Sequence, residues 1–397
     1  MNIDVKSVVI AKSEELFEKV VGYRQHLHQY PELSYQEYNT MKFISEQLSQ
    51  IGIPHQTGVA ETGIVALIKG KHHSENQPCI GLRADIDALP IQELNEIPFA
   101  SKNQGVMHAC GHDVHTSILL GVAEILWELR ENLPHPVKLI FQPGEEKNPG
   151  GASLMIQADC LSNPPVMKMY ALHADPDIEV GKVGTKEGLF MASCDEIYID
   201  IIGKGGHGAR PQQAVDSILV GAEIVTSLQK IVSRNCDPNI PCVLTFGHFE
   251  GLGATNVIPE KVHLKGTFRT MNEGWRAEAL ERIQKQSELI AQAHGAEAKV
   301  EISHGYPFLE NDVTTTREFI QNAQNWLGAE NVIPNMEMRM GSEDFSFYAQ
   351  VVPVCFFRIG VRNKHAQRIS GLHTATFNID NQSLKIGMQL MTMNCII

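Results

Sequence analysis

The spacing of hydrophobic residues along the chain predicts which segments are helices and which are strands. Residues 13–29 and 37–51 carry apolar side chains at the helical period of three to four positions, and Pro31 ends the first segment. Residues 63–70 and 78–90 contain short apolar runs bounded by turn residues, which is typical of strands. The chain is therefore expected to alternate helices with strands.

The same alternation continues in most of the remaining chain. The further segments that we predict are helices at 113–132, 313–327 and 382–393, and strands at 137–142, 166–174 and 354–360. Buried strands that alternate with helices are expected of an α/β domain.

The pattern changes near Gly188. Between residues 195 and 304 the predicted order is strand, helix, strand, strand, helix, strand, which is the ferredoxin-like arrangement of a small α+β domain. We therefore expect one domain formed by residues 1–187 and 307–397, and a second domain, 188–306, inserted into it. A length of 397 residues also exceeds what one hydrophobic core usually organises.

Composition and charge exclude several classes of protein. A formal net charge of -13 argues against nucleic acid or an anionic membrane as a partner. No apolar run approaches the length of a membrane span, and charged residues interrupt the N-terminal apolar runs, so we expect neither a membrane anchor nor a secretory signal. The eight cysteines lack the spacing of a disulfide framework and are expected to be reduced thiols of a cytoplasmic protein.

The stretch GVMHACGHDVH is the part of the chain richest in metal-ligand side chains. It places His108, Cys110, His112 and His115 next to Asp113. A thiolate and an imidazole one residue apart suit a borderline divalent ion such as zinc or manganese. Alternatively, Cys110 is a small buried hydrophobic residue and the histidines only stand at the start of a helix. The density of ligands between glycines favours the metal site.

Polar side chains near the ends of predicted strands fit the same chemistry. Glu145 and Glu146 follow a buried strand, so one can ligate a metal while the other takes a proton from water; the alternative is a solvated acidic turn. Asp87 can orient a metal ligand or cap a turn. His173 ends another strand, and His207 stands in a glycine-rich loop, either exposed for function or as an ordinary surface histidine.

Eight motifs, in order, carry a resemblance to a known family. They are RQHLHQYPELSYQE, RADIDALP, MHACGHDVH, QPGEE, GGHGARP, NVIP, GSEDFS and GLHTATF, and together they span almost the whole chain. With these motifs the chain resembles the metallopeptidase family M20, specifically its amidohydrolase branch. That branch contains hippurate hydrolases, N-acyl-L-amino acid amidohydrolases and indoleacetyl-amino acid hydrolases.

The resemblance implies a fold, a reaction and a cofactor. The fold is a mixed-sheet, zinc-peptidase-like catalytic domain with an inserted ferredoxin-like domain that serves as lid and for homodimerisation. The reaction is hydrolysis of the amide bond of a small N-acyl amino acid. The cofactor is a pair of divalent ions, of zinc, manganese, cobalt or nickel, which lower the pKa of water from about 15.7 towards about 7.

The resemblance also implies roles for single residues. The residues that match the family's metal ligands are Cys110, which would bridge the two ions, His112, Glu146, His173 and His373. Glu145 matches the catalytic base, and Asp87 matches an aspartate that supports the centre. Related enzymes have a ligand histidine where this chain has Asp85, and His112 compensates for it.

The inserted domain is expected to contribute three residues to the site. His207 is similar to a lid histidine that reaches the active site of the partner subunit, and Asn256 and Arg269 look like residues that bind the substrate carboxylate. The planar guanidinium of Arg269 suits both oxygens of a carboxylate. Gly144 is a mild departure from the family pattern, because the resemblance leads us to expect alanine there.

Two other functions remain open from the sequence. In the first, Cys110 is the nucleophile of a metal-independent cysteine amidase, with His112 or His173 as its base, and chelators have no effect. In the second, the protein is a catalytically silent dimeric binding protein. The intact Glu145 argues against the second, because loss of the base is the simplest route to such a protein.

Overall fold

The computed structural model describes residues 5–365 and 369–396, and the chain divides into two compact units. Unit 1 consists of Met1–Gly188, Glu310–Glu337 and Phe347–Ile397. Unit 2 consists of Leu189–Leu309 and Met338–Ser346. Unit 2 is thus mainly an insertion into unit 1. It also includes the short segment Met338–Ser346, which comes later in the chain.

Over the described residues, unit 1 contains a mixed eight-stranded sheet in the order β1-β2-β4-β3-β5-β16-β6-β15. Its strands are β1 (His55–Val59), β2 (Gly63–Ile68), β3 (Cys79–Asp85), β4 (Val137–Gln142), β5 (Val166–Glu179), β6 (Val183–Gly184), β15 (Val332–Ile333) and β16 (Val354–Arg362). β3 pairs in parallel with β4 and β5, and β5 pairs in parallel with β16. The carboxyl ends of these central strands therefore lie at one edge of the sheet, where α/β proteins place their sites.

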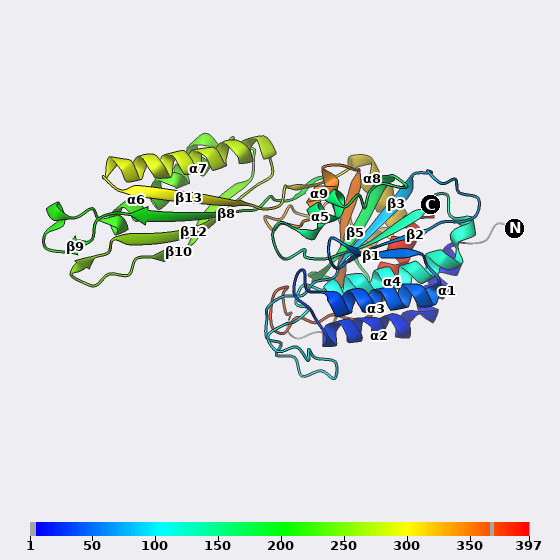
Figure 1. The fold of residues 1–397 in the computed structure, drawn as a ribbon. Helices are drawn as coiled ribbons and strands as arrows, with labels where there is room; N and C mark the ends of the chain where they lie inside the picture. Colours follow the sequence, from blue (N-terminus) through cyan, green and yellow to red (C-terminus); the bar gives the residue numbers. More distant parts are fainter. Residues whose placement is uncertain (1–4, 366–368, 397) are drawn as a thin grey trace. The chain divides into compact units, whose positions relative to one another are not determined.

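Helices cover this sheet and share one hydrophobic core with it. They are α1 (Val5–Glu15), α2 (Phe17–Gln29), α3 (Tyr38–Ile51), α4 (His112–Glu128), α8 (Val313–Leu327) and α10 (Gln382–Met393). The short helix α5 (Gly151–Gln157) also belongs to unit 1, but its residues lie outside this core. Ile44 of α3, Ile118 of α4 and Leu384 of α10 belong to the same core as Leu82 and Phe357 of the strands. α2 and α3 pack on α4 (Figure 1). All seven residues of β3 are buried, because both faces of the central strands are covered.

The hydrophobic period predicted most of these elements but missed helix boundaries at two places. The helix predicted at 113–132 is α4, which ends at Glu128, and a 3-10 turn follows at Arg130–Asn132. Helices predicted at 37–51, 313–327 and 382–393 are confirmed as α3, α8 and α10, to within one residue. The helix predicted at 13–29 is wrong as a single element, because α1 ends at Glu15 and α2 begins at Phe17. Leu16 lies at the junction with its side chain buried, so the apolar period continues across the break.

Unit 2 has a four-stranded sheet in the order β10-β12-β8-β13, with every neighbouring pair antiparallel. Its main elements are β8 (Asp195–Ile202), α6 (Ser217–Lys230), β10 (Cys242–Glu250), β12 (Lys261–Thr270), α7 (Glu273–Ala293) and β13 (Glu297–His304). This order confirms the predicted ferredoxin-like arrangement. Ile197, Ile199 and Ile201 of β8 alternate with more exposed residues, and α6 and α7 share a separate core with them.

Short elements complete the fold. They are β9 (Gly206–His207) and β11 (Val257–Ile258), which pair with each other in unit 2, and β7 (Gly188–Met191), β14 (Leu309–Asn311) and α9 (Ser346–Ala349). In the described part of the chain, no helix is both long and apolar enough to cross a membrane.

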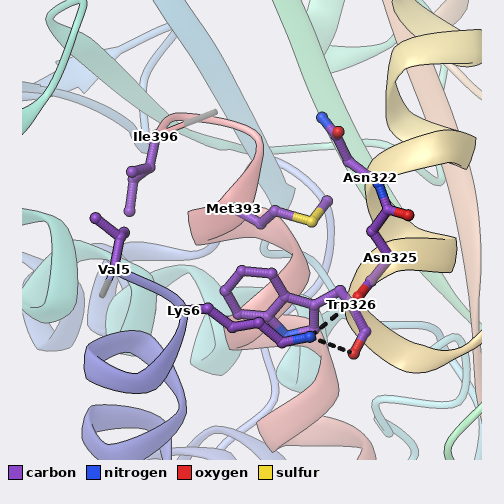
Figure 2. Close-up of a pocket in the computed structure, with 7 residues that line it drawn as sticks. All are labelled: Val5, Lys6, Asn322, Asn325, Trp326, Met393 and Ile396. Atoms are coloured by element: carbon purple, nitrogen blue, oxygen red, sulfur yellow. Dashed lines mark hydrogen bonds between the residues drawn. The ribbon is translucent and has the colours of Figure 1, made fainter. Parts of the chain in front are cut away.

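A pocket in unit 1 lies between the ends of α1, α8 and α10 (Figure 2). Lys6 extends along Trp326 and donates hydrogen bonds from Nζ to the carbonyl oxygens of Asn325 (3.0 Å) and Trp326 (3.2 Å). These are terminal carbonyls of α8, so the ammonium group caps the negative end of the helix dipole. The pocket shares no residue with the metal-ligand candidates predicted from the sequence.

Candidate metal centre

The predicted ligand Cys110 stands just before α4, and His112 is the first residue of that helix. Gly111 between them has φ +91°, a left-handed conformation that favours glycine, and an added Cβ would lie 2.9 Å from Cβ of Ala174. This tight turn brings Cys110 and His112 to the same side of the helix terminus. Both side chains are buried.

His112 has one ring nitrogen fixed by hydrogen bonds and the other available. Its Nδ1 lies 2.9 Å from the carbonyl oxygen of Asp87 and 3.1 Å from Oδ1 of the same residue. Both partners are acceptors, so Nδ1 carries a proton, and in the neutral imidazole that can bind a metal the lone pair lies on Nε2. Nε2 is buried and has no hydrogen-bond partner among the described residues. A buried nitrogen in this state fits a metal ligand held by an outer carboxylate.

Three carboxylates surround the free nitrogen of His112. Its Nε2 lies 3.7 Å from Oδ2 of Asp85, 3.9 Å from Oε2 of Glu145 and 4.0 Å from Oε1 of Glu146. Burial acts to lower the pKa of His112, but the neighbouring carboxylates, with Asp85 and Asp87 first, outweigh burial and raise it to about 10. A positive charge is therefore stabilised at this point, as a divalent ion requires.

Cys110 lies between two other imidazoles. Its Sγ is 3.3 Å from Nε2 of His173 and 3.3 Å from Nε2 of His373. His173 donates from Nδ1 to the carbonyl oxygen of Ala174 (2.8 Å), so its Nε2 lone pair faces the sulfur. Burial, followed by the charges of Glu146 and Glu145, raises the pKa of the Cys110 thiol well above its usual range. Reactive cysteines usually occupy electropositive surroundings, and this one does not.

His373 and Glu146 complete the second side of the cluster. His373 Nε2 lies 3.2 Å from Oε1 of Glu146. The backbone of His373 has φ +58°, and its N–H donates to the carbonyl oxygen of Ala109 (2.8 Å). A histidine in the left-handed region carries strain that the surrounding structure must hold, and such residues cluster at functional sites.

The five predicted ligands thus form two overlapping groups within unit 1. One group is Cys110, His112 and His173, and the other is Cys110, Glu146 and His373. Within each group the donor atoms lie within 4.8 Å of one another. Cys110 belongs to both groups. Sulfur, nitrogen and oxygen donors in such groups fit zinc, manganese, cobalt or nickel, and the buried free Nε2 of His112 agrees with a metal at this place.

His115, which the motif presented as an equal candidate, has no nitrogen left for a metal. Its Nδ1 donates to Oδ1 of Asp85 (2.6 Å), and its Nε2 accepts the N–H of Ala174 (2.8 Å). Arg83 donates to the other oxygen of Asp85 (2.6 Å). Asp85 and His115 therefore tie β3 and α4 to the backbone beside His173. His115 follows His112 by three positions, so in a helix both side chains project from one face. This spacing is the feature of the sequence that predicts His115 to lie beside the metal ligands.

The residues expected from the inserted domain lie at two separate places in unit 2. His207 pairs with Val257 in the small sheet, and Gly208 N–H donates to the carbonyl oxygen of Asn256 (2.8 Å), so His207 and Asn256 are close neighbours beyond the Ile202 end of β8. Arg269 lies beside the other end of β8 and donates to the carbonyl oxygen of Met340 (2.9 Å). An eight-residue strand separates the two places by roughly 20 Å or more.

Comparisons with known proteins agree with this geometry. Residues 81–393 match the profile of peptidase family M20/M25/M40. The chain is 42% identical over 293 residues to an N-acyl-L-amino acid amidohydrolase of Geobacillus stearothermophilus, covering 74% of this chain and 78% of the relative. It is 38% identical over 392 residues to an IAA-amino acid hydrolase of Arabidopsis thaliana, covering 98% and 87%.

A solved structure gives the same result for the fold. A dinuclear metal-binding peptidase of family M20 from Bacillus subtilis matches with a TM-score of 0.80 and 33% identity, covering 96% of this chain and 98% of that one. The family profile covers more than half of the chain, and both relatives exceed 30% identity over most of it. The chain therefore belongs to peptidase family M20/M25/M40.

Proposed function

We propose that this protein is a metal-dependent amidohydrolase that cleaves N-acyl-L-amino acids, of the hippurate or N-acetyl type, to a carboxylic acid and a free amino acid. The observation that carries the proposal is the pair of donor groups that share the sulfur of Cys110, with Glu145 beside them. The names of relatives that are 38% and 42% identical support the same reaction class.

Two divalent ions would be held by Cys110, His112, Glu146, His173 and His373, of which Cys110 belongs to both donor groups. When bound, such ions supply Lewis-acid chemistry and lower the pKa of water towards neutrality. The dinuclear centre named for the related Bacillus subtilis peptidase supports a count of two. Asp87 orients His112 through the contact to Nδ1, which leaves Nε2 for the metal.

Glu145 is the proposed general base. Its carboxylate is buried and lies 3.9 Å from His112 Nε2, so it faces the ligand cluster rather than bulk water. In the reaction the water oxygen adds to the amide carbon while Glu145 takes the water proton. The C–N bond then breaks, and Glu145 returns the proton to the leaving nitrogen, which departs as the amine of the amino acid.

We further propose that residues 188–306 serve as a lid and dimerisation domain. Exposed apolar side chains of unit 2 support a homodimer; they are Ile218, Leu219, Phe249, Leu252 and Val257. Phe249 belongs to β10, which is an edge strand of its sheet. Because His207 and Arg269 lie roughly 20 Å or more apart along β8, one small substrate cannot touch both within one subunit. This supports His207 acting in the site of the partner subunit, separately from Arg269.

All eight cysteines are free thiols, which supports a cytoplasmic location. The competing proposal of a cysteine amidase is disfavoured by the raised pKa of the Cys110 thiol, since the thiolate is the nucleophile in such enzymes. It also gives no role to Glu146 and His373. A silent binding protein remains distinguishable by experiment.

The test is release of free amino acid from hippurate and a series of N-acetyl amino acids, before chelation, after it, and after zinc or manganese is restored. We expect activity to disappear and return. Glu145→Gln should keep its metal and lose activity, whereas Cys110→Ala should lose both. Activity that survives chelation would instead make Cys110 the nucleophile, and an inactive wild type on every substrate would favour the binding protein.

A further inference from the structure

The segment 31–37, with the sequence PELSYQE, lies between α2 and α3 and has no role in the function proposed so far. It forms no regular element except a bridge from Leu33 to Ala88. Even so, Ser34 and Glu37 are buried polar residues, and Tyr35 has a left-handed backbone with φ +65°. Buried polar groups and a strained backbone in a connecting segment call for specific partners.

Glu37 holds the start of the loop that carries the proposed base. Its Oε1 accepts the N–H of Gly144 (2.9 Å), and its Oε2 accepts the hydroxyl of Thr62 (2.6 Å). Gly144 directly precedes Glu145. The Glu37 side chain is fully buried, so no water can replace this acceptor without rearrangement.

Tyr35 holds the end of the same loop and occupies space beside its beginning. Its hydroxyl donates to the carbonyl oxygen of Lys147 (2.8 Å). Its ring stands where a side chain at Gly144 would be, since an added Cβ would lie 2.3 Å from Cε1 of the ring. Gly144 has φ +58°, so the residue there is also in the region that favours glycine. Glu37 and Tyr35 therefore bracket the loop at both ends.

Ser34 connects the segment 31–37 to the proposed metal ligands through Asp87. Its hydroxyl donates to Oδ2 of Asp87 (2.6 Å), and the same oxygen accepts the N–H of Glu146 (3.0 Å). The other oxygen of Asp87 contacts His112. One carboxylate thus connects the segment, a proposed metal ligand on the loop, and the first histidine of α4.

We propose that Tyr35 and Glu37 are positioning residues that fix the carboxylate of Glu145 relative to the metal ligands, and that Ser34 supports them through Asp87. The proposal rests on the function proposed for Glu145. Neither residue needs to touch the substrate, because each acts on the backbone of residues 144–147. A displacement of about 1 Å at a catalytic group can cost about a hundredfold in rate, so a small relaxation of this loop is sufficient.

The test compares Glu37→Leu with Glu37→Gln, which keeps an oxygen acceptor for Gly144. The control is Thr62→Val, which removes the hydrogen bond to Oε2 of Glu37 and leaves the contact of Oε1 with the loop in place. The first measurement is amide hydrogen exchange of the peptide that covers residues 143–150, in the full-length protein. We expect at least tenfold faster exchange in Glu37→Leu, and exchange close to wild type in Glu37→Gln and Thr62→Val.

The second measurement is steady-state hydrolysis of N-acetyl-L-methionine, together with metal content by elemental analysis. Glu37→Leu should lower kcat by about thirtyfold to a hundredfold, with KM and metal content within about threefold of wild type. Unchanged exchange in Glu37→Leu, or an equal loss of kcat in Thr62→Val, overturns the proposal. Failure of the proposed function shows separately, as a Glu145→Gln protein that retains the wild-type rate.

Discussion

Because of the surroundings of the buried residue His28, we expect the protein to lose stability at alkaline pH. His28 lies between two carboxylates, with Nδ1 2.9 Å from Oδ2 of Asp113 and Nε2 3.1 Å from Oε1 of Glu93. Arg24 also contacts Asp113, at 3.2 Å from Nε to Oδ2. Burial acts to lower the pKa of His28, but the hydrogen bonds to the two carboxylates outweigh it and raise the pKa from 6.5 to about 9. The imidazole is therefore protonated in the folded protein at neutral pH.

The sign and size of the effect follow from linkage. At pH 7 the unfolded chain has a mostly neutral His28, whereas the folded chain holds the proton, so folding takes up a proton. The resulting stabilisation is fully present below pH 6.5 and is lost as the pH rises through about 9. A pKa raised from 6.5 to about 9 is worth about 2 to 3 kcal/mol at pH 7, at 1.36 kcal/mol per pKa unit.

The assay is urea unfolding of wild type and His28→Gln at pH 6, 7, 8, 9 and 10, followed by circular dichroism with chelator present throughout. Other groups also titrate in this range, including buried thiols such as Cys79, whose pKa burial raises to about 11. Their contribution is common to both proteins and cancels in the difference. The difference in unfolding free energy should fall by about 2 kcal/mol between pH 7 and pH 10. A difference that stays constant with pH would refute a protonated His28.

Two further predictions concern Gly144 and the proposed dimer. Gly144→Ala should lose about 2 to 3 kcal/mol of stability and most activity, because it adds a Cβ at positive φ and drives it into the ring of Tyr35. Gly105→Ala is the matched control in urea unfolding and activity assays: its φ is +74° with open space around the new Cβ, so it should lose about 1 kcal/mol and keep its activity. Inactive His207→Ala and Glu145→Gln proteins should regain activity when their subunits are exchanged, measured as amino acid release from the mixture.

Specific results would contradict the predictions for the glycine variants and for subunit exchange. Equal losses of stability in the two glycine variants would mean that the Tyr35 ring moves freely away. Verified subunit exchange without recovered activity would place His207 outside the partner's site.

The sequence predicted the longer elements because their burial repeats at a fixed period. α3 and α8 bury one stripe each, and β8 buries every second residue, so local spacing was sufficient. The two-residue strands β9 and β11 have no such period, since their pairing joins His207 to Val257 across distant segments. Local spacing also could not show that one helix ends and the next begins at Leu16, because Leu16 is buried and continues the apolar pattern across the junction.

The candidate site, too, was only partly predictable from the sequence. The motifs identified the residue types, but spacing along the chain cannot show that Cys110 and His373, 263 residues apart, meet at 3.3 Å. Nor can it show that His115 has both nitrogens engaged, because one partner is the backbone N–H of Ala174. The sequence assigned Tyr35 and Glu37 no role beyond membership of the motif RQHLHQYPELSYQE, since their partners are backbone atoms of a loop more than a hundred residues later.

The position of β16 has a consequence for how the chain must fold during synthesis. β16 lies between β5 and β6 and pairs with both, although it is made long after them. Until the ribosome has released Val354–Arg362, β5 and β6 have an unpaired edge, and His373 follows later still. Open strand edges invite pairing with other chains. A premature stop codon just before Val354 should therefore yield an aggregating polypeptide that lacks one proposed metal ligand, rather than a shortened enzyme.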